Sequence, residues 1–331
     1  MKRKSLRNTA FALFASILLT SCATDNELIA PPVVTTFRLG MDTQTRAAQA
    51  LNPTQYPTKL YLYKATADAM GETYYAFDHC TDVSSQAVTL ENLEQNNHYK
   101  AVFLSIPAKQ TPALPEFTET QQPYEKAQAE YIHQPANNQQ PETDNDLFRS
   151  IVDFTASPGT GTQNAVLTRQ NGALEVRIKG ISNLSKVELH LKGHTSLLLQ
   201  DGTGGQVLTQ GEPVALSKVQ TFKNAPTQVR IRINLLPQED ITDRNNGNDN
   251  YLLVTTDVPG EGTGIINQKE TKYPIRSAHP SIPIYPNQVT WLTLGKDNDS
   301  SGGNFEVSFG DKGNIDLEDG DWDGWNDNYT K

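Results

Sequence analysis

The sequence has few cysteines, fewer basic than acidic residues and a low hydrophobic content. Two cysteines exclude a disulfide scaffold and a cysteine-based zinc site. With 28 Lys and Arg against 38 Asp and Glu, the net charge is −10, which argues against nucleic-acid partners because phosphate binding needs clustered basic side chains. Although only 36% of the 331 residues are hydrophobic, they include runs that can build a core. The length predicts two domains, or one large all-β domain.

Patterns typical of enzymes and metal centres are also missing. The sequence has no G-x-S-x-G motif, and its glycine-rich stretches do not lie between a strand and a helix, so they predict turns rather than phosphate-binding loops. His190 and His194 lie on an apparent strand and turn, and the 6 histidines show no metal-ligand spacing. We therefore expect no enzyme, no cofactor and no metal centre, although 38 acidic residues are compatible with the carboxylate pair of a polysaccharide-processing enzyme.

The N-terminus is typical of a bacterial lipoprotein signal peptide. Its first residues are largely basic, and residues 10–19 form an apolar stretch that is too short to cross a membrane as a helix. The stretch ends in Leu19-Thr20-Ser21-Cys22, the pattern of a lipobox. A thiol is needed here because Cys22 receives a diacylglycerol, and cleavage before it exposes an amine for acylation. We predict a signal peptide at residues 1–21. The alternative is an ordinary secretory signal with a chance cysteine.

Lipidation of Cys22 predicts attachment to the outer membrane at the cell surface. Two or more acyl chains give stable attachment, whereas a single chain is marginal. Removal of residues 1–21 leaves 24 basic against 38 acidic residues, a net charge of −14, so electrostatic attraction to an anionic membrane does not contribute. Residues 22–32 predict a flexible tether. Cys80, the remaining cysteine, is expected to be a buried, inert thiol.

Period-two alternation of apolar and polar residues predicts an all-β fold. In SKVELHLKG, for example, Val187, Leu189 and Leu191 alternate with polar residues. Strands without intervening helices indicate antiparallel β-sandwiches. A boundary in the polar stretch 157–163 gives an N-terminal sandwich at 33–160 and a C-terminal sandwich at 161–331. The predicted strands lie at 33–41, 59–65, 73–77, 87–90, 99–106, 165–169, 174–178, 187–191, 229–235, 250–256, 288–294 and 304–309.

Residues 107–146 separate the two strand series and are rich in Gln, Asn, Pro and Glu. We expect a long irregular connection without strands and with at most one short helix, around 124–132. Connections of this length are usually functional or mobile.

The order of several segments resembles a known family. A lipoprotein signal precedes KLYLYKA, HYKAVFLSIP, DLFRSIVDF, LTRQNGALEVRIKG and PNQVTWLTL, and the chain closes near Asp321-Trp322. This order is similar to that of the fimbrillin-A associated anchor proteins of Bacteroidota fimbriae (the FimB-type family). The resemblance implies two transthyretin-like antiparallel β-sandwich domains. It also implies a protein at the base of a fimbrium that binds shaft subunits, holds the polymer to the outer membrane and limits its length.

The resemblance further implies that subunits join by β-strand addition, in which main-chain hydrogen bonds and side-chain pockets hold a partner's strand. Shaft and tip subunits of such fimbriae are cut after an N-terminal Arg, which removes the lipid and opens a groove. This chain has Arg38 in a predicted strand and Arg46 in the loop TQTRAAQ. Arg46 is the candidate cleavage site if the protein is a stalk or tip subunit. In an anchor, neither site is cut.

A third possibility is a glycan- or host-binding surface lipoprotein, an adhesin. Tyr61, Tyr63, Tyr74 and Tyr75 are the candidates for an aromatic platform that binds sugars. At strand spacing, however, such residues are expected to be core residues and cross-strand pairs.

The C-terminal tail has the D-x-D-x-D-G spacing of a calcium loop, with Asp319, Asp321 and Asp323, and Asp327 takes the ninth position. Thr330 stands where a bidentate Glu is expected, and no helical pattern flanks the loop. We favour a solvated acidic terminus. A weak calcium-like site formed by these four aspartates is the alternative.

Overall fold

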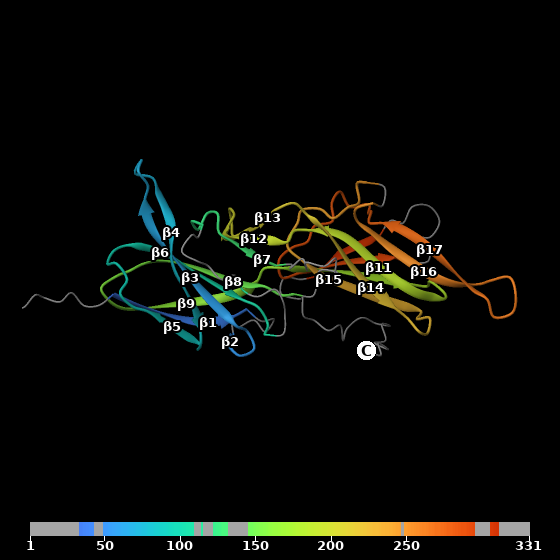
Figure 1. Ribbon diagram of the computed structural model, residues 1–331, viewed down its shortest axis with the longest axis horizontal. Coiled ribbons are helices and arrows are strands. Elements are labelled where there is room, and N and C mark those ends of the chain that lie inside the picture. The colour runs from blue at the N-terminus through green and yellow to red at the C-terminus, as the bar shows by residue number, and fades with distance from the viewer. Residues whose placement is uncertain are drawn as a thin grey trace, which may run out of the picture. The chain divides into compact units, whose positions relative to one another are not determined.

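The computed structural model describes residues 33–42, 49–108, 114, 122–131, 145–245, 248–294 and 305–310. These residues form strands, turns and loops but no helix, so none of them belongs to an apolar helix that crosses a membrane. They lie in one compact unit, residues 32–331 (Figure 1). The prediction of an all-β fold with several antiparallel sheets is confirmed. The transthyretin-like topology stays a prediction.

An eight-stranded sheet occupies the N-terminal half. Its strands, in their order across the sheet, are β2 (Gln49–Ala50), β1 (Val33–Met41), β9 (Gly159–Arg169), β8 (Phe148–Thr155), β6 (His98–Ser105), β3 (Thr58–Ala67) and β4 (Thr73–Val83), and β5 (Ala87–Leu90) pairs with β1. β1 and β9 run parallel. The rings of Phe103 and Phe154 both contact Phe37 edge to face, with centroids 5.3 Å apart. Aromatic residues of β1, β6 and β8 thus build one hydrophobic core.

β9 belongs to this N-terminal sheet, and its parallel pairing covers every residue of β1. Ala165 and Leu167 of β9 are fully buried in the same core as Phe37. Residues 161–169, which the sequence analysis assigns to the C-terminal domain, therefore share a sheet with β1, and the next sheet begins at Gly172. The Gly- and Thr-rich composition of 157–163 is typical of a linker, but strand pairing uses only the backbone. The division into two domains stays a prediction.

Three smaller sheets follow. The first has the strand order β15 (Gln228–Leu235), β10 (Gly172–Lys179), β18 (Val289–Leu294) and β19 (Glu306–Phe309). The second has the order β14 (Val214–Thr221), β11 (Leu184–Gly193), β16 (Tyr251–Pro259) and β17 (Ile266–Pro274). The third has three strands, in the order β13 (Val207–Gln210), β12 (Ser196–Asp201) and β7 (Gln128–Glu130). Leu174 and Val176 of β10 and Val187 and Leu189 of β11 are fully buried in one hydrophobic cluster. The two four-stranded sheets therefore share a core.

β7 corrects the expectation for the excursion 107–146. Residues 128–130, predicted to lie in a short helix, form a strand that pairs with β12, and Ala129 lies opposite Leu197. Ala127, Ala129 and Tyr131 are buried, whereas the two residues between them are exposed. This is the two-residue period of a strand, but it is too short to stand out in a polar stretch of the sequence.

The N-terminal sheet and the C-terminal strands are joined by a shared core and a buried arginine. Tyr61, Tyr63 and Val102 pack in the same hydrophobic cluster as the residues of β10 and β11. Arg149 of β8 donates to the carbonyls of Leu198 (2.7 Å) and Leu199 (3.0 Å) in β12, and pairs with the Asp201 carboxylate. Burial lowers the pKa of Arg149, and Asp201 opposes this effect.

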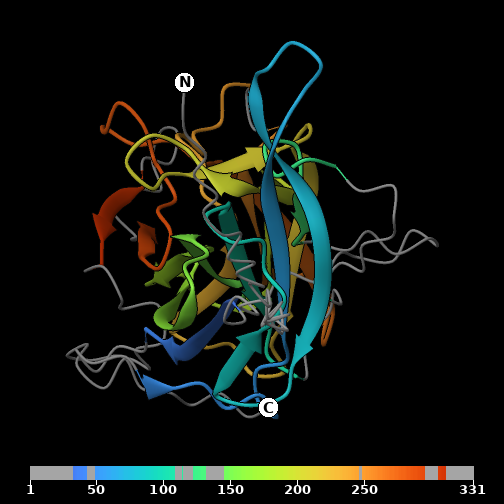
Figure 2. The same cartoon turned by 90° about the vertical axis from the view of Figure 1, so that its left-hand side faces the viewer.

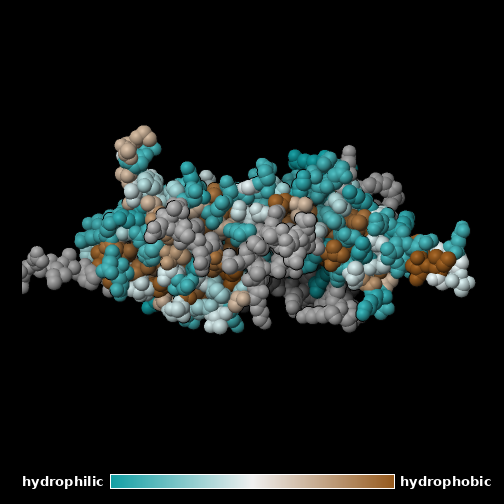
Figure 3. Space-filling view, viewed as in Figure 1, coloured by the Kyte–Doolittle hydropathy of each residue, from teal (hydrophilic) through white to brown (hydrophobic). Residues whose placement is uncertain are grey.

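Two hairpin loops carry exposed apolar side chains. β3 and β4 stay paired beyond Lys64, the last residue of β3 that pairs with β6, and their loop extends away from the sheet (Figure 2). Met70 in this loop is 84% exposed. Ile265 and Ile266, in and after the loop between β16 and β17, are 52% and 67% exposed, and an apolar patch lies there (Figure 3). Neither loop contributes to the cores.

Candidate functional site

β4 is the outer strand of the eight-stranded sheet, and β3 is its only strand partner among the described residues. It is 11 residues long, whereas β2, at the opposite end of the strand order, has 2. An outer strand carries backbone N–H and C=O groups that point away from the sheet and are available to another strand. β4 is therefore the longer of these two edges.

The N-terminal part of this edge is covered by the turn before β7. The carbonyl of Tyr75 accepts from the Tyr124 N–H (2.9 Å), and the Tyr75 N–H donates to the Glu125 carboxylate (3.3 Å). The ammonium of Lys100 lies 4.7 Å from the centroid of the Tyr75 ring and 5.1 Å from that of Tyr124. These contacts satisfy the edge at Tyr75, whereas the described residues place no second strand beside residues 79–83 of β4.

A β-bulge separates the two parts. Leu62 pairs with His79 and Tyr63 pairs with Phe77, so Asp78 is the extra residue on β4. A bulge bends a strand and increases its twist, and bulges are common where a sheet edge is redirected. Because of the bulge, residues 79–83 run in a different direction from the part of β4 around Tyr75.

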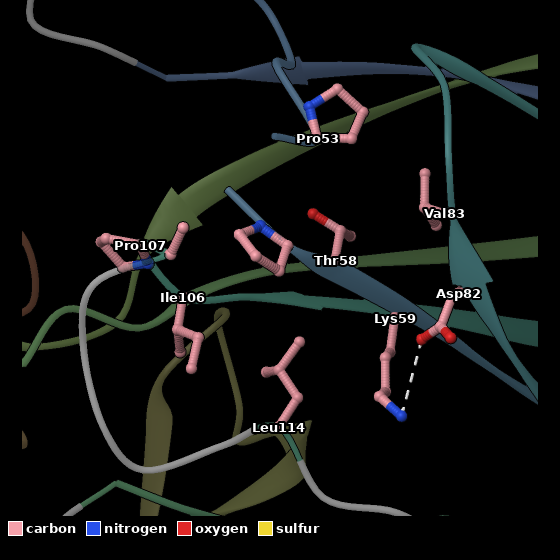
Figure 4. Close-up of a pocket in the computed structure, with 10 residues that line it drawn as sticks. Pro53, Thr58, Lys59, Asp82, Val83, Ile106, Pro107 and Leu114 are labelled. Carbon is pink, nitrogen blue, oxygen red and sulfur yellow. Dashed lines mark ion pairs between the residues drawn. The ribbon is translucent and has the colours of Figure 1, made fainter. Parts of the chain in front are cut away.

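An apolar pocket of about 390 Å³ lies at the C-terminal end of β4 (Figure 4). Val83 of β4, Ile106 after β6, and Leu114 contribute aliphatic side chains. The remaining lining residues come from β4, from the start of β3 and from the loops beside them: Asp82; Thr58 and Lys59; and Pro53, Pro57, Pro107 and Ala108. A concave, mostly apolar site of this size accommodates a side chain or a small ligand.

Backbone contacts fix the walls of the pocket. The carbonyl of Pro57 accepts from the Ser105 hydroxyl (3.1 Å) and from the Ile106 N–H (3.3 Å), and the Ala108 N–H donates to the Gln55 carbonyl (2.9 Å). Proline has a fixed φ angle and no N–H to satisfy, so the three prolines give walls that need no reorganisation. In the sequence these prolines indicate only strand ends, and nothing indicates that they meet.

An ion pair marks the rim. The Lys59 ammonium lies 3.5 Å from the Asp82 carboxylate, and the Lys59 side chain is 18% exposed against 81% for Asp82 (Figure 4). The Thr58 hydroxyl donates to the Tyr56 carbonyl (2.8 Å). A strand beside residues 79–83 would place alternate side chains toward the pocket.

The tyrosines considered as a sugar platform are dispersed. Tyr61 and Tyr63 are fully buried, which confirms their interpretation as core residues, and burial raises the pKa of the Tyr63 phenol. Tyr75 contacts Tyr124 edge to face, with centroids 6.2 Å apart, beneath Lys100. Tyr74 is partly buried opposite Thr66 of β3. These four residues do not form one exposed surface.

Cys80 on β4 is partly buried and packs against the core cluster. The ring of His190 stacks on Tyr251 with centroids 4.4 Å apart, and burial lowers the pKa of His190 against the opposing effect of Glu188. The His194 ring contacts the Gly211 carbonyl (3.0 Å). Among the residues that the structure describes, no three potential metal ligands lie together.

Several predicted sites lie outside the described residues. They are the lipidation site Cys22, the candidate cleavage site Arg46 and the calcium-like set Asp319, Asp321, Asp323 and Asp327. Arg38 is described, and it lies within β1, which pairs with β9 on one side and with β5 on the other.

The described residues thus define an all-β protein with a long outer strand beside an apolar pocket. The chain belongs to the family of fimbrillin-A associated anchor proteins Mfa1 and Mfa2, which it matches over residues 30–307. This match confirms the resemblance seen in the sequence. The protein is therefore a fimbria-associated surface protein, from a family that is not one of enzymes.

The chain also matches several solved structures. The fimbrial anchor protein Mfa2 of Porphyromonas gingivalis is 11% identical, with 84% of this chain and 97% of that chain covered and a TM-score of 0.44. A candidate adhesin of Bacteroides ovatus is 12% identical, with 84% of this chain and 92% of that chain covered and a TM-score of 0.47. A candidate cell adhesion protein of Bacteroides eggerthii is 14% identical, with 85% of this chain and 95% of that chain covered and a TM-score of 0.45. No curated protein matches the sequence.

Proposed function

We propose that this protein is a lipid-anchored surface protein that holds a fimbrium at the outer membrane and limits its length. The family match over residues 30–307 is the observation that carries the proposal. The lipobox at Cys22 supplies the membrane attachment, and the tether 22–32 joins the lipid to β1. The protein acts at the base of the fimbrium, without catalysis and without a cofactor.

The partner in this proposal is a fimbrial shaft subunit, and the contact is β-strand pairing. The position of β4 as the outer strand of its sheet and the pocket at its end support this assignment, because a sheet edge can supply main-chain hydrogen bonds and a pocket can supply selectivity. The covered part of β4 at Tyr75 restricts a partner strand to one end of the edge.

A stalk or tip subunit is the alternative within the same class, and it requires a cut after Arg46. Arg38 is a poor protease site because β1 is paired on both sides, and a protease needs a segment that can leave the sheet. The two roles therefore differ in whether residues 22–46 remain in the mature protein.

Mass spectrometry of the mature protein from cells separates these roles. An N-terminus at a diacylated Cys22 supports the anchor, whereas an N-terminus at Ala47 refutes it. In a Cys22→Ala strain we expect overlong fimbriae that are shed into the medium. Cys80→Ala is the matched control, because it removes the other thiol without touching the lipobox. Unchanged attachment in the Cys22→Ala strain contradicts the proposal.

A further inference from the structure

A groove of about 970 Å³ lies among the C-terminal strands and shares no lining residue with the pocket at β4. The end of β11, β13, and the loops that follow β15 and β17 form its walls. Gln238 and Ile284 join two of these loops by paired backbone hydrogen bonds of 3.2 and 2.9 Å. The walls also contain four prolines: Pro213, Pro237, Pro283 and Pro286. The groove is therefore preformed, as ligand sites usually are.

Four charged side chains of the groove form two ion pairs, and Glu239 adds a further carboxylate. The Lys192 ammonium lies 2.9 Å from the Asp249 carboxylate, and the Arg244 guanidinium lies 2.6 Å from Asp240. Asp240 also accepts hydrogen bonds from the Thr242 hydroxyl (2.6 Å) and N–H (2.9 Å). This pairing leaves no excess of positive charge for a phosphate or sulfate. A ligand that fits the groove is uncharged and hydrogen-bonds to charged side chains held in place.

An exposed aromatic ring stands beside these polar groups. Tyr285 lines the groove and is 47% exposed, and its ring contacts Phe309 with centroids 6.1 Å apart. The backbone of Tyr285 is fixed by Gly172, since an ideal Cβ at this glycine would lie 2.2 Å from the Tyr285 carbonyl oxygen. Contact with Phe309 and the fixed backbone together restrict the position of the Tyr285 ring.

We infer that this groove binds a neutral oligosaccharide. Sugar hydroxyls both donate and accept hydrogen bonds, so they match a surface where ammonium, guanidinium and amide donors alternate with carboxylate acceptors. The C–H groups of a sugar ring are weakly positive and are attracted to the negative face of an aromatic ring such as that of Tyr285. Gln206, Gln238 and Glu239 add further polar side chains to the lining. This inference does not depend on the anchoring role.

An extended peptide fits the groove less well. β13 is the outer strand of its sheet and lines the groove, but it has 4 residues, and its pairing with β12 shifts register between Leu197 and Asp201. Strand addition needs a regular edge of several residues. The prolines in the opposite walls lack the N–H groups that a second strand contact requires.

The test is calorimetric titration of the soluble mature chain with maltotetraose, cellotetraose, mannotetraose and xylotetraose. We expect at least one of these to bind, and Tyr285→Ala to weaken that binding about tenfold or more, the effect of roughly 1.4 kcal/mol. Tyr285→Phe keeps the ring and should keep the affinity within about threefold. Tyr74→Ala, the same substitution on β4 outside the groove, should leave binding unchanged.

Two results overturn the inference. One is the absence of binding to all four tetrasaccharides by a chain whose melting curve shows that it is folded. The other is binding that Tyr285→Ala and Tyr74→Ala alter equally, because the sugar then binds elsewhere. Hydrogen exchange with a purified shaft subunit covers the peptide alternative: new protection of the Val207–Gln210 amides would assign the groove to a protein strand.

Discussion

Replacement of Arg149 by methionine tests how much this side chain contributes to the stability of the contact between the N-terminal sheet and β12. The Arg149 side chain is 3% exposed, and its guanidinium donates to the carbonyls of Leu198, Leu199 and Gln200 and pairs with Asp201. Methionine has a similar length, so the main loss is in hydrogen bonds and charge rather than in volume.

The magnitude follows from what remains after the change. Removal of one partner of a buried ion pair costs about 3–5 kcal/mol. Because the Asp201 side chain is 38% exposed, water can replace the guanidinium there, whereas the Leu199 carbonyl loses a buried donor. We therefore expect the lower end of the range, about 3 kcal/mol. At about 2–4 °C per kcal/mol for a unit of this size class, Tm should fall by about 6–12 °C.

Differential scanning calorimetry measures this shift, and Arg38→Met is the matched control because Arg38 is exposed on β1. An exposed substitution usually changes stability by less than about 0.5 kcal/mol. Arg149→Lys, which keeps the charge but not the planar fork, should fall between wild type and Arg149→Met. Equal Tm values for Arg149→Met and Arg38→Met would refute this contribution.

Three further predictions follow from the described contacts. Gly172→Ala should lower Tm by several degrees, because the added Cβ meets the Tyr285 carbonyl at 2.2 Å; Gly161→Ala, whose Cβ meets nothing closer than 4.0 Å, is the control in the same melting assay. Ala108→Trp should fill the pocket at β4 and weaken pull-down of shaft subunits, and equal recovery with the exposed Ala87→Trp would exclude the pocket. Burial raises the pKa of Asp240, but hydrogen bonds from Thr242 and the Ile282 N–H and the pairing with Arg244 outweigh it and lower the pKa from 3.8 to about 2. Because the folded-state pKa is lowered, this stabilisation is present above the unfolded-state pKa and is lost as pH falls toward 2. The stability difference from Asp240→Asn, measured by urea unfolding, should shrink over that range, and a constant difference would contradict the assignment.

Local alternation predicted the strands with clear apolar and polar faces, such as those at 33–41 and 187–191. It missed β17, because residues 266–272 are nearly all exposed and polar, and what keeps them extended is pairing with β16. It also gave no sign that the partner of β9 is β1, more than a hundred residues earlier. Long-range pairing leaves no mark in a local window of sequence.

The candidate site was hidden for the same reason. Pro53, Val83, Ile106 and Leu114 come from four separate segments, and each is ordinary in its own surroundings. Tyr285 follows a run of prolines and isoleucines that predicts a loop, and neither its exposure nor the polar groups beside it can be inferred without the paired loops. The prediction for Cys22, in contrast, needs only the sequence, because a signal peptide is a linear pattern that does not depend on the fold.

The position of β1 explains why an anchor and a shaft subunit must use different surfaces. β1 pairs with β9 and β5, and its Phe37 is fully buried between Phe103 and Phe154. A cut after Arg46 that released β1 would take Phe37 with it and leave an apolar groove that only another strand could fill, because a cavity of that size is strongly destabilising. A chain that keeps its lipid also keeps β1, so that groove stays closed to a partner. In the anchoring role that we propose, subunits would then join at another edge, for which residues 79–83 of the outer strand β4 are our candidate, and growth at that end would stop.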